Sequence, residues 1–269
     1  IVVSGVGLAA IYISPITNYL LLNFGIPQTF LFLGIAALVL IVVFAQFARV
    51  PETTRPELSN NKKNIVKSYN APIATALKDV EWKNMVKVAS FYKYWIMMAF
   101  STSAGLMIIG HIAVIAVKQA NWENGFLLVI LLAVFNAAGR LVAGFISDKI
   151  GVHNTMKILF FLQAINMILF SFYDSTFTLA IGTAITGFCY GGLFSVFPAA
   201  TAGEFGIKNL GVNYGLVFTS YGFGGVVGPI MAGKILDVSG SYSAAYIASA
   251  VLLVLAGILA FTFKNKPDN

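Results

Sequence analysis

The sequence has little charge, one cysteine and two histidines. Only 10% of its 269 residues are charged, whereas soluble domains carry about 25%. The single cysteine, Cys189, excludes a disulfide within the chain and a cysteine-based metal cluster. The apolar stretches contain no Ser/His/Asp set and no group of metal ligands. The sequence therefore predicts no enzyme, no cofactor and no metal site.

Long apolar runs dominate what is present, and hydrophobic residues make up 58% of the chain. A helix needs about 20 apolar residues to cross the hydrocarbon core of a bilayer. Continuous runs favour helices, since membrane strands alternate apolar and polar residues over segments of roughly ten. The sequence predicts an all-α membrane protein. The eight expected spans are 4–22, 29–48, 95–117, 125–146, 155–173, 177–200, 212–235 and 242–263.

The positive charges predict the orientation in the membrane. Nine of the 17 cations lie in the polar segment 49–94, which the positive-inside rule places in the cytoplasm. Alternation along the chain then puts five more cations on the same side, namely Lys149, Lys157, Lys208, Lys264 and Lys266. A nucleic-acid partner is not expected, because these charges do not cluster on a solvated fold. We expect a multi-pass protein of the cell membrane, with a cytoplasmic C-terminus and lipid around it.

The order of the elements predicts part of a larger carrier. Two spans, a long basic segment and six further spans correspond to helices 5–12 of a twelve-helix protein, with four helices missing before residue 1. We expect residues 1–48 to hold the last two helices of an N-terminal half. Residues 49–94 would be the linker between halves, 95–264 the six-helix C-terminal half and 265–269 a cytoplasmic tail.

Glycines and prolines repeat between the first and seventh spans. Gly5-x-Gly7 with Pro15 parallels Gly222-x-Gly224 with Pro229, as expected where the two halves of a transporter are related. Glycines let membrane helices approach closely, either in static packing or in a seam that slides or hinges. Both interpretations stay open for the four seam glycines, Gly222, Gly224, Gly225 and Gly228.

Within the basic segment, Ile73–Val88 has two interpretations. It is either an interfacial amphipathic helix, with lysines facing anionic headgroups, or part of a solvated linker. Glu204 and Lys208 lie in a later turn that is expected in the cytoplasm. Charge pairs there are expected to hold the inner side closed, although each surface pair contributes only about 0–1 kcal/mol.

Arg140 is the most informative residue, because it lies inside an expected span that holds no acidic residue. An intramembrane arginine costs about 3 kcal/mol even on the lenient insertion scale. Asn136 lies four residues earlier and so on the same helical face. Together they predict a clamp for a carboxylate. The alternative is that Arg140 extends to the cytoplasmic headgroups or pairs with Asp148.

Aromatic residues and one histidine complete the candidate site. Tyr190 with Phe194, and Phe218 with Tyr221, share helical faces by their spacing. They either line a cavity, with tyrosine hydroxyls donating to a carboxylate, or pack within the protein. His111 is the one imidazole in an expected span, and it is either a proton carrier or a structural group.

The stretch after Arg140 carries a recognisable pattern. Ser147, Asp148 and Lys149 close the helix and Gly151 starts a tight turn, which we interpret as a conformational gate. The full pattern resembles the cytoplasmic-loop signature of the major facilitator superfamily after helix eight, so the resemblance implies the major facilitator fold. It reads Gly139-Arg140-x-x-x-Gly144-x-x-Ser147-Asp148-Lys149-x-Gly151.

Three further segments resemble the oxalate/formate antiporter family, which is related to the monocarboxylate transporters. They are 91–95 (FYKYW), 104–111 (AGLMIIGH) and 213–219 (NYGLVFT). The resemblance implies that Arg140 binds the substrate carboxylate, and bacterial lactate-type members are similar at Asn136. Animal monocarboxylate carriers have an aspartate there, so their proton coupling is not implied. Oxalate carriers have a helix-eleven lysine where this sequence reads 218–221 (FTSY), which favours a monoanion.

These features predict a secondary active transporter of small organic anions. The expected substrates are monocarboxylates such as lactate, pyruvate or formate, moved by a monomer through alternating access. Protons or a counter-anion would drive the movement. Two alternatives remain: an oxalate/formate dicarboxylate exchanger, and a membrane sensor that keeps a carrier fold without transport.

Overall fold

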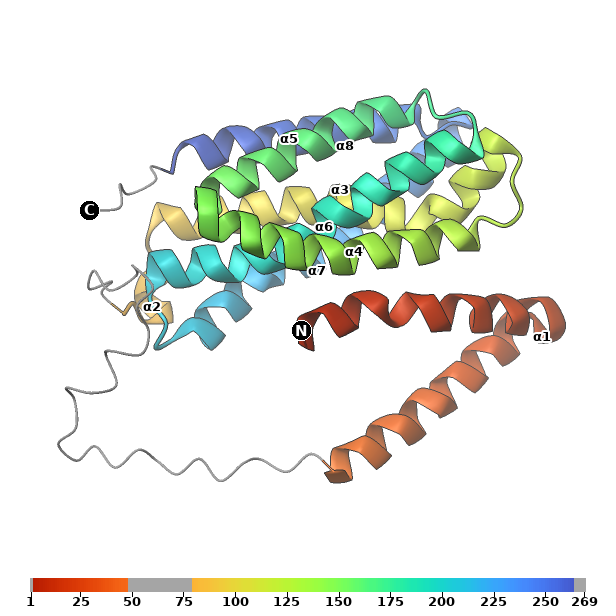
Figure 1. Cartoon of the computed structure of the whole chain (residues 1–269), viewed down its shortest axis with the longest axis horizontal. Coiled ribbons are helices and arrows are strands. Elements are labelled where there is room, and N and C mark those ends of the chain that lie inside the picture. The colour runs from red at the N-terminus through yellow and green to blue at the C-terminus, as the bar shows by residue number, and fades with distance from the viewer. Residues whose placement is uncertain (1, 48–78, 264–269) are drawn as a thin grey trace. The chain divides into compact units, whose positions relative to one another are not determined.

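A computed structural model describes residues 2–47 and 79–263 of the chain, and it describes side chains from residue 11 onward. All regular elements in these residues are helices (Figure 1). The chain divides into two compact units. One unit holds most of α1, and the other holds α2 to α8.

Helix α1 (Val2–Phe47) is a bent helix that covers the first two expected spans. Gly25 interrupts it with a φ of 75° and a ψ of 176°, a left-handed conformation that glycine adopts without steric cost. The hydroxyl of Thr29 donates to the Gly25 carbonyl at 2.7 Å and ties the second arm to the bend. The two arms are visible in Figure 1. Because of the bend, α1 provides two apolar arms rather than one straight rod.

The second unit contains a bundle of six long helices. They are α3 (Ala89–Ala120), α4 (Phe126–Ile150), α5 (Val152–Phe170), α6 (Thr176–Phe205), α7 (Leu210–Ser239) and α8 (Ser243–Phe261). Each is long and apolar enough to cross a membrane. The main packing pairs are α3 with α7, α4 with α6, and α5 with α8. The last six expected spans therefore correspond to six helices. Their ends differ from the expected ranges: α3, α6 and α7 extend further at both ends, whereas α8 lies within its range.

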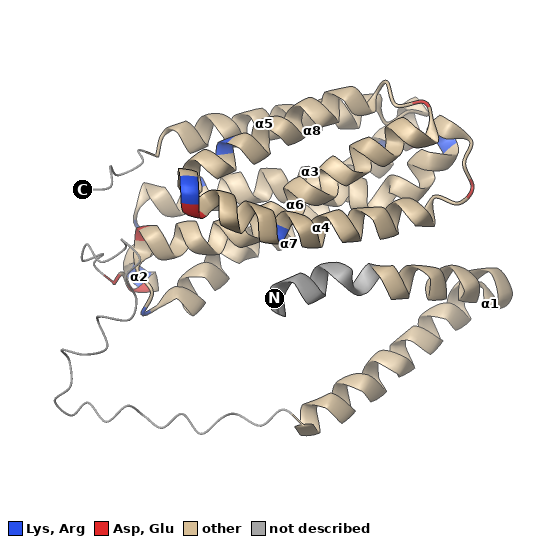
Figure 2. Ribbon diagram, viewed as in Figure 1, with Lys and Arg blue, Asp and Glu red and all other residues tan. Residues whose placement is uncertain are grey.

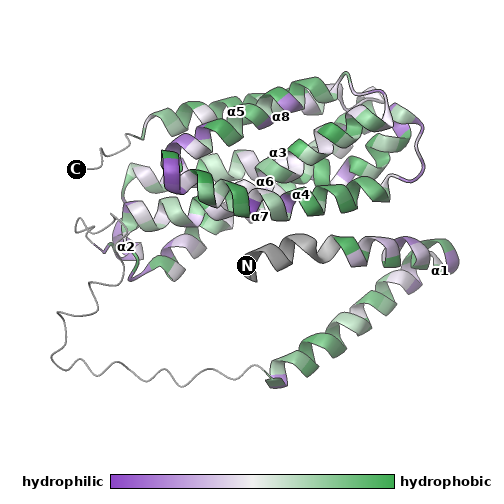
Figure 3. Cartoon of the chain, viewed as in Figure 1, coloured by the Kyte–Doolittle hydropathy of each residue, from purple (hydrophilic) through white to green (hydrophobic). Residues whose placement is uncertain are grey.

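The surface of the bundle is apolar, and charge is confined mainly to the helix ends. Figure 2 shows most lysine, arginine and acidic residues near those ends, and Figure 3 shows hydrophobic residues along the helix shafts. Large apolar side chains such as Phe145, Phe172 and Phe177 are at least 70% exposed. An apolar face of this kind is stable against lipid, not against water.

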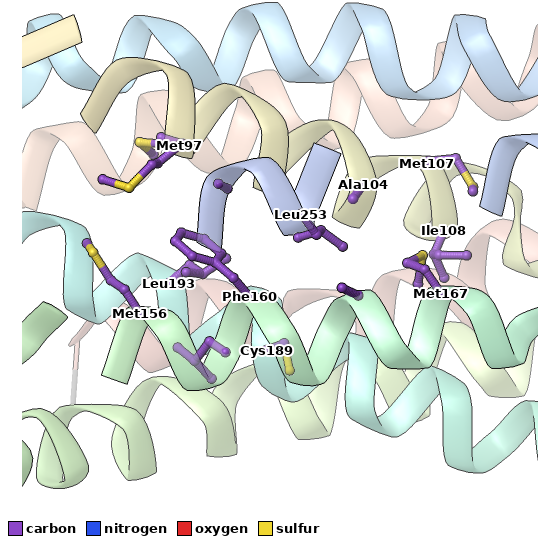
Figure 4. Close-up of a cluster of buried hydrophobic side chains, with 14 of the residues drawn as sticks. Met97, Ala104, Met107, Ile108, Met156, Phe160, Met167, Cys189, Leu193 and Leu253 are labelled. Atoms are coloured by element: carbon purple, nitrogen blue, oxygen red, sulfur yellow. The ribbon is translucent and has the colours of Figure 1, made fainter. Parts of the chain in front are cut away.

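The buried core of the bundle contains side chains from several helices. Met97 of α3, Phe160 of α5, Leu193 of α6 and Leu253 of α8 lie in one buried cluster (Figure 4). Cys189 of α6 lies in the same cluster and is fully buried. The single thiol therefore acts as a small apolar side chain in the core.

Helices α4 and α6 approach at backbone distance, because glycine stands at each point of contact. A Cβ atom at Gly139 would meet the carbonyl of Phe188, and one at Gly191 would meet the carbonyl of Asn136. A Cβ at Gly187 would meet the carbonyl of Leu132. This contact places the turn of α4 that carries Asn136 and Arg140 directly against α6.

The pairing of α3 with α7 also depends on glycine, but only at two of the four seam positions. A Cβ at Gly224 would meet Thr102, and one at Gly228 would meet the carbonyl of Ser103. A Cβ at Gly225 would lie in ordinary contact with a leucine, at 3.5 Å. At Gly222, no described atom lies within 4 Å of the Cβ position. The close approach therefore lies along one stripe of α7.

Of the two interpretations of Ile73–Val88, a continuous interfacial helix is not found in the described part. Residues 79–81 are not helical, and α2 (Trp82–Met85) has only four residues; residues 73–78 lie outside the described part. Val80 N–H donates to the Phe205 carbonyl at 2.9 Å, and the Val80 carbonyl accepts from Asn213 Nδ2 at 2.9 Å. Both peptide groups bond to the α6–α7 turn, so this segment follows the turn instead of coiling.

Candidate functional site

Arg140 and Asn136 form the centre of the candidate site on α4. Asn136 is buried, with 6% exposure, and Arg140 is half-buried. Arg140 Nε donates to Asn136 Oδ1 at 3.0 Å. Residues four apart in a helix are neighbours, so the contact follows from the helix itself. The amide holds the guanidinium by its Nε edge and limits its rotation.

Helix α6 covers the guanidinium with an aromatic ring. The Cζ atom of Arg140 lies 4.9 Å from the centroid of the Phe194 ring, which is within the range of a cation–π interaction. Tyr190 lies one turn earlier on α6, and its ring centroid is 5.0 Å from that of Phe194. Phe194 therefore adds an attraction that keeps the planar guanidinium beside α6.

Helix α7 brings two more rings to the same place. Phe218 and Tyr221 stack with centroids 5.1 Å apart and an interplanar angle of 11°. The Phe194 ring lies 6.0 Å from Phe218 and 5.7 Å from Tyr221. The structure thus brings together all six residues that the sequence suggested for substrate binding, from three different helices.

Tyr214 is a seventh member of this group, and it was not among the site residues predicted from the sequence. Its ring centroid lies 5.6 Å from that of Phe218. Residues 214, 218 and 221 share one face of α7, so the spacing used for the last two could have identified the first. The Arg140 cluster comprises Asn136, Arg140, Tyr190, Phe194, Tyr214, Phe218 and Tyr221.

Tyr190 owes its position to a glycine on α3. A Cβ atom at Gly105 would collide with the Tyr190 ring. Tyr190 is consequently almost buried, with 7% exposure, between α3 and the rest of the cluster. Gly105 lies in the sequence run 104–111 but was not identified as a site residue. The contribution of Gly105 depends on the packing of α3 against α6, which the sequence alone does not show.

The expected gate residues form a separate group at the end of α4. Gly151 has a φ of 84° and ends the helix, and its N–H donates to the Ser147 carbonyl at 3.0 Å. Asp148 and Lys149 are exposed there, whereas no described atom lies within 4 Å of a Cβ at Gly144. Asp148 is eight residues beyond Arg140, about 12 Å along the helix axis. Ser147, Asp148, Lys149 and Gly151 therefore lie apart from the Arg140 cluster, whereas Gly139 of the same pattern is adjacent to Arg140 and packs against α6.

His111 lies on α3 outside the cluster and has a partner at each ring nitrogen. Its Nε2 lies 3.1 Å from the Pro229 carbonyl, and its Nδ1 lies 2.9 Å from the hydroxyl of Tyr242. A carbonyl only accepts, so Nε2 carries a proton, and in the neutral ring the hydroxyl donates to Nδ1. Burial and the negative charge of Asp237 raise the pKa of Tyr242 and keep that donor protonated. The arrangement suits a structural link between α3 and α7.

The turn between α6 and α7 is also tied to the start of the bundle. Ser90 Oγ donates to Glu204 Oε1 at 2.8 Å. The backbone N–H of Lys208 donates to Asp79 Oδ1 at 3.1 Å. Gly206 has a φ of 87°, and a Cβ there would meet Asp79. The expected role of Glu204 and Lys208 in closing the inner side stays a prediction, whereas their local contacts anchor residues 79–90.

The chemistry available in the Arg140 cluster is non-covalent recognition of an anion. It offers one cation, one carboxamide, three phenol hydroxyls and two apolar rings. A guanidinium binds a carboxylate through two parallel hydrogen bonds. Among residues 2–47 and 79–263, no group of three or more histidine, cysteine or acidic residues could hold a metal ion.

Comparison with known proteins supports a transporter relationship. The sequence matches the family model of the Major Facilitator Superfamily over residues 1–173 and 135–269. The oxalate:formate antiporter of Oxalobacter formigenes is 26% identical over 267 residues, covering 96% of this chain and 59% of the antiporter. The uncharacterized MFS-type transporter YhjX of Escherichia coli K12 is 28% identical over 225 residues.

That second match covers 82% of this chain and 52% of YhjX. The chain thus spans little more than half the length of these two relatives. Monocarboxylate transporter 9 of Gallus gallus is 31% identical over 134 residues, which cover 49% of this chain and 26% of the transporter. The similarities extend over carriers named for oxalate and formate and for monocarboxylates.

Proposed function

Because the chain belongs to the major facilitator superfamily, we propose that it is the part of a secondary transporter that binds a small monocarboxylate. Lactate, pyruvate and formate are the proposed substrates, carried by alternating access of a midplane site. The observation that carries the proposal is the Arg140 guanidinium, held by Asn136 at 3.0 Å and covered by Phe194 at 4.9 Å.

The charge of the cluster matches one carboxylate. Arg140 is its one cation, and the other members are neutral amide, phenol and phenyl groups. A monoanion bound to Arg140 leaves no net charge in the apolar surroundings, whereas a dianion leaves one negative charge that burial penalises. Tyr190 and Tyr221 can donate hydrogen bonds to the carboxylate oxygens without adding charge.

Exchange of oxalate against formate is the second candidate. It is supported by the 26% identity with the oxalate:formate antiporter over 96% of this chain. Oxalate carries two negative charges, so this function needs a second cation near the substrate. Such a cation would come from outside the Arg140 cluster.

The signature turn and the glycine seam are proposed to serve the conformational change. Asp148 and Lys149 lie exposed at the end of α4, where they can contact another part of the protein in one state and release it in the other. The close contacts of Gly224 and Gly228 with α3 give a smooth surface along which two helices can shift. We place this end of the bundle and the C-terminus in the cytoplasm, following the positive-inside rule.

Uptake into proteoliposomes containing the full-length protein tests the function. Labelled lactate, pyruvate, formate and oxalate would each be offered, with and without a pH gradient or internal anion. We expect uptake of at least one monocarboxylate and its loss in Arg140→Gln and Arg140→Lys. Lys118→Gln, which removes an exposed cation at the end of α3, is the matched control and should transport normally.

The outcomes separate the candidates. Saturable uptake of oxalate exceeding that of the monocarboxylates would favour the exchanger. Normal uptake by Arg140→Lys would contradict the bidentate clamp, because a lysine ammonium is a point charge without the planar fork. Absence of uptake of all four anions by the wild type would contradict the transporter proposal and favour a sensor.

A further inference from the structure

We infer that Tyr214 is a further substrate-contacting residue, which donates a hydrogen bond to the carboxylate on Arg140 and limits substrate size at one end of the site. The inference rests on the proposed function, since it assigns one more contact to the same anion. Tyr214 lies in the run 213–219 that carries the family resemblance, but it was not among the site residues predicted from the sequence. Tyr214 joins the Arg140 cluster through its ring contact with Phe218, which packs against Phe194 beside Arg140.

The Tyr214 side chain packs within the aromatic part of the Arg140 cluster. The Tyr214 ring lies 5.6 Å from the Phe218 ring, and the Phe218 ring lies 6.0 Å from that of Phe194. Phe194 in turn covers Arg140. Tyr214 is half-buried, and its ring packs against Phe218. The Tyr214 ring therefore lies at the end of a row of rings that leads through Phe218 and Phe194 to the guanidinium.

Arg140, Tyr214 and Tyr190 lie at different distances from the ends of their helices. Arg140 lies ten residues before the end of α4, about 15 Å from the end where the α4–α5 and α6–α7 turns lie. Tyr214 lies four residues after the start of α7, about 6 Å from the same end. Tyr190 lies fifteen residues before the end of α6, about 22 Å from it. Counted along its own helix, Tyr214 thus lies nearer to this end of the bundle than Arg140 does.

Hydrogen bonds fix the first turn of α7, which carries Tyr214. The neighbouring Asn213 is fully buried, and its Nδ2 donates to the Val80 carbonyl at 2.9 Å. Asn209 Nδ2 donates to the same carbonyl at 3.3 Å. These bonds fix the rotation of the first turn of α7. A hydroxyl held on a fixed helix turn loses little conformational entropy when it binds a ligand.

Tyr214 therefore has two roles in the proposed site, one for its hydroxyl and one for its ring. Its hydroxyl is a neutral hydrogen-bond donor, so it strengthens the binding of every monocarboxylate. A second cation in its place would instead favour a dianion. The Tyr214 ring occupies the space between Arg140 and the nearer end of the bundle, so it restricts the length of the substrate chain. The first role depends on the oxygen atom, and the second depends on the ring.

Two variants of the full-length protein separate these roles. Tyr214→Phe removes the hydroxyl alone, and Tyr214→Leu also removes the ring. The probes are labelled formate, pyruvate, lactate and butyrate, with KM, kcat and thermal unfolding measured for each protein. Tyr92→Phe and Tyr92→Leu are the matched controls, because Tyr92 is an exposed aromatic residue near the start of α3.

We expect Tyr214→Phe to raise KM for formate, pyruvate and lactate about tenfold with kcat unchanged, since a hydrogen bond to a charged group is lost. We expect Tyr214→Leu to raise the ratio of butyrate to formate transport as well. Unchanged KM values and an unchanged ratio in both variants, with Arg140→Gln inactive, would overturn the inference and leave the proposed function intact. A wild-type protein that transports none of the probes would overturn both.

Discussion

Arg140 and Asn136 are joined by a hydrogen bond of 3.0 Å from Nε to Oδ1, across a single turn of α4. The amide neutralises no charge, so the guanidinium keeps its full attraction for an anion. It also occupies the Nε edge and so influences how a carboxylate can approach. Asn136 therefore orients the Arg140 guanidinium without reducing its positive charge.

Asn136→Asp and Asn136→Leu test this orienting role. Asn136→Asp places a negative charge against the guanidinium, and we expect KM for monocarboxylates to rise more than tenfold. Asn136→Leu removes only the orienting bond, and we expect a rise of about threefold to tenfold. Transport kinetics in proteoliposomes provide the measurement. Asn154→Asp, an equivalent change in the first turn of α5, should leave KM unchanged. Equal KM values in all three variants would contradict the orienting role.

Gly139→Ala and Gly144→Ala should differ sharply in stability, although both glycines lie in the signature pattern. A Cβ at Gly139 would meet the backbone of Phe188, whereas a Cβ at Gly144 meets no described atom within 4 Å. We expect Gly139→Ala to cost about 1–3 kcal/mol and to lower the thermal midpoint by several degrees. Thermal unfolding in detergent measures the difference. A larger loss for Gly144→Ala would contradict the observed α4–α6 packing.

Tyr242→Phe tests the role of His111. It removes the donor to Nδ1 and leaves an unsatisfied nitrogen, so we expect a loss of about 1 kcal/mol in stability. KM for the anion should not change, because Tyr242 lies outside the Arg140 cluster. His111→Gln, which keeps an N–H donor, distinguishes the roles further. If that variant abolishes uptake driven by a pH gradient but keeps anion exchange, His111 is a proton carrier and not only a structural link.

Gly206→Ala tests the anchoring of residues 79–81 on the α6–α7 turn. The φ of 87° disfavours any other residue, and the added Cβ would meet Asp79. We expect a loss of about 1–3 kcal/mol and faster proteolysis before α3. Gly203→Ala, on α6 and without a described neighbour within 4 Å, should behave as wild type. Similar proteolysis rates for the two variants would contradict the anchoring.

Local patterns in the chain were sufficient for several correct predictions. The apolar runs identified the helices of the bundle, because the thickness of a bilayer sets their length. The spacing of Asn136 and Arg140 predicted their contact, because it lies within one helix. The signature around Arg140 indicated the superfamily, which the match over residues 1–173 and 135–269 confirms. The role of the gate residues stays a prediction.

A continuous helix, one of the two interpretations left open for Ile73–Val88, does not form in the described part, and the reason is physical. Amphipathic spacing describes the preference of an isolated segment, but Val80 forms its hydrogen bonds with Phe205 and Asn213, more than 120 residues away. The sequence does not show that such partners are near. Similarly, the four seam glycines look equivalent in sequence, yet only Gly224 and Gly228 meet the backbone or side chains of α3 closely.

The sequence by itself determined the membrane class, the helices, and a charge at Arg140 that must have a partner, since these follow from hydropathy and from contacts within one helix. Only the tertiary structure decided which aromatic rings surround that charge. Phe194 reaches Arg140 because Gly139 and Gly191 let α4 and α6 touch, and Phe218 and Tyr221 meet Phe194 because α7 turns one face towards α6. Such contacts depend on how helices pack, and a pattern within one helix carries no record of its neighbour.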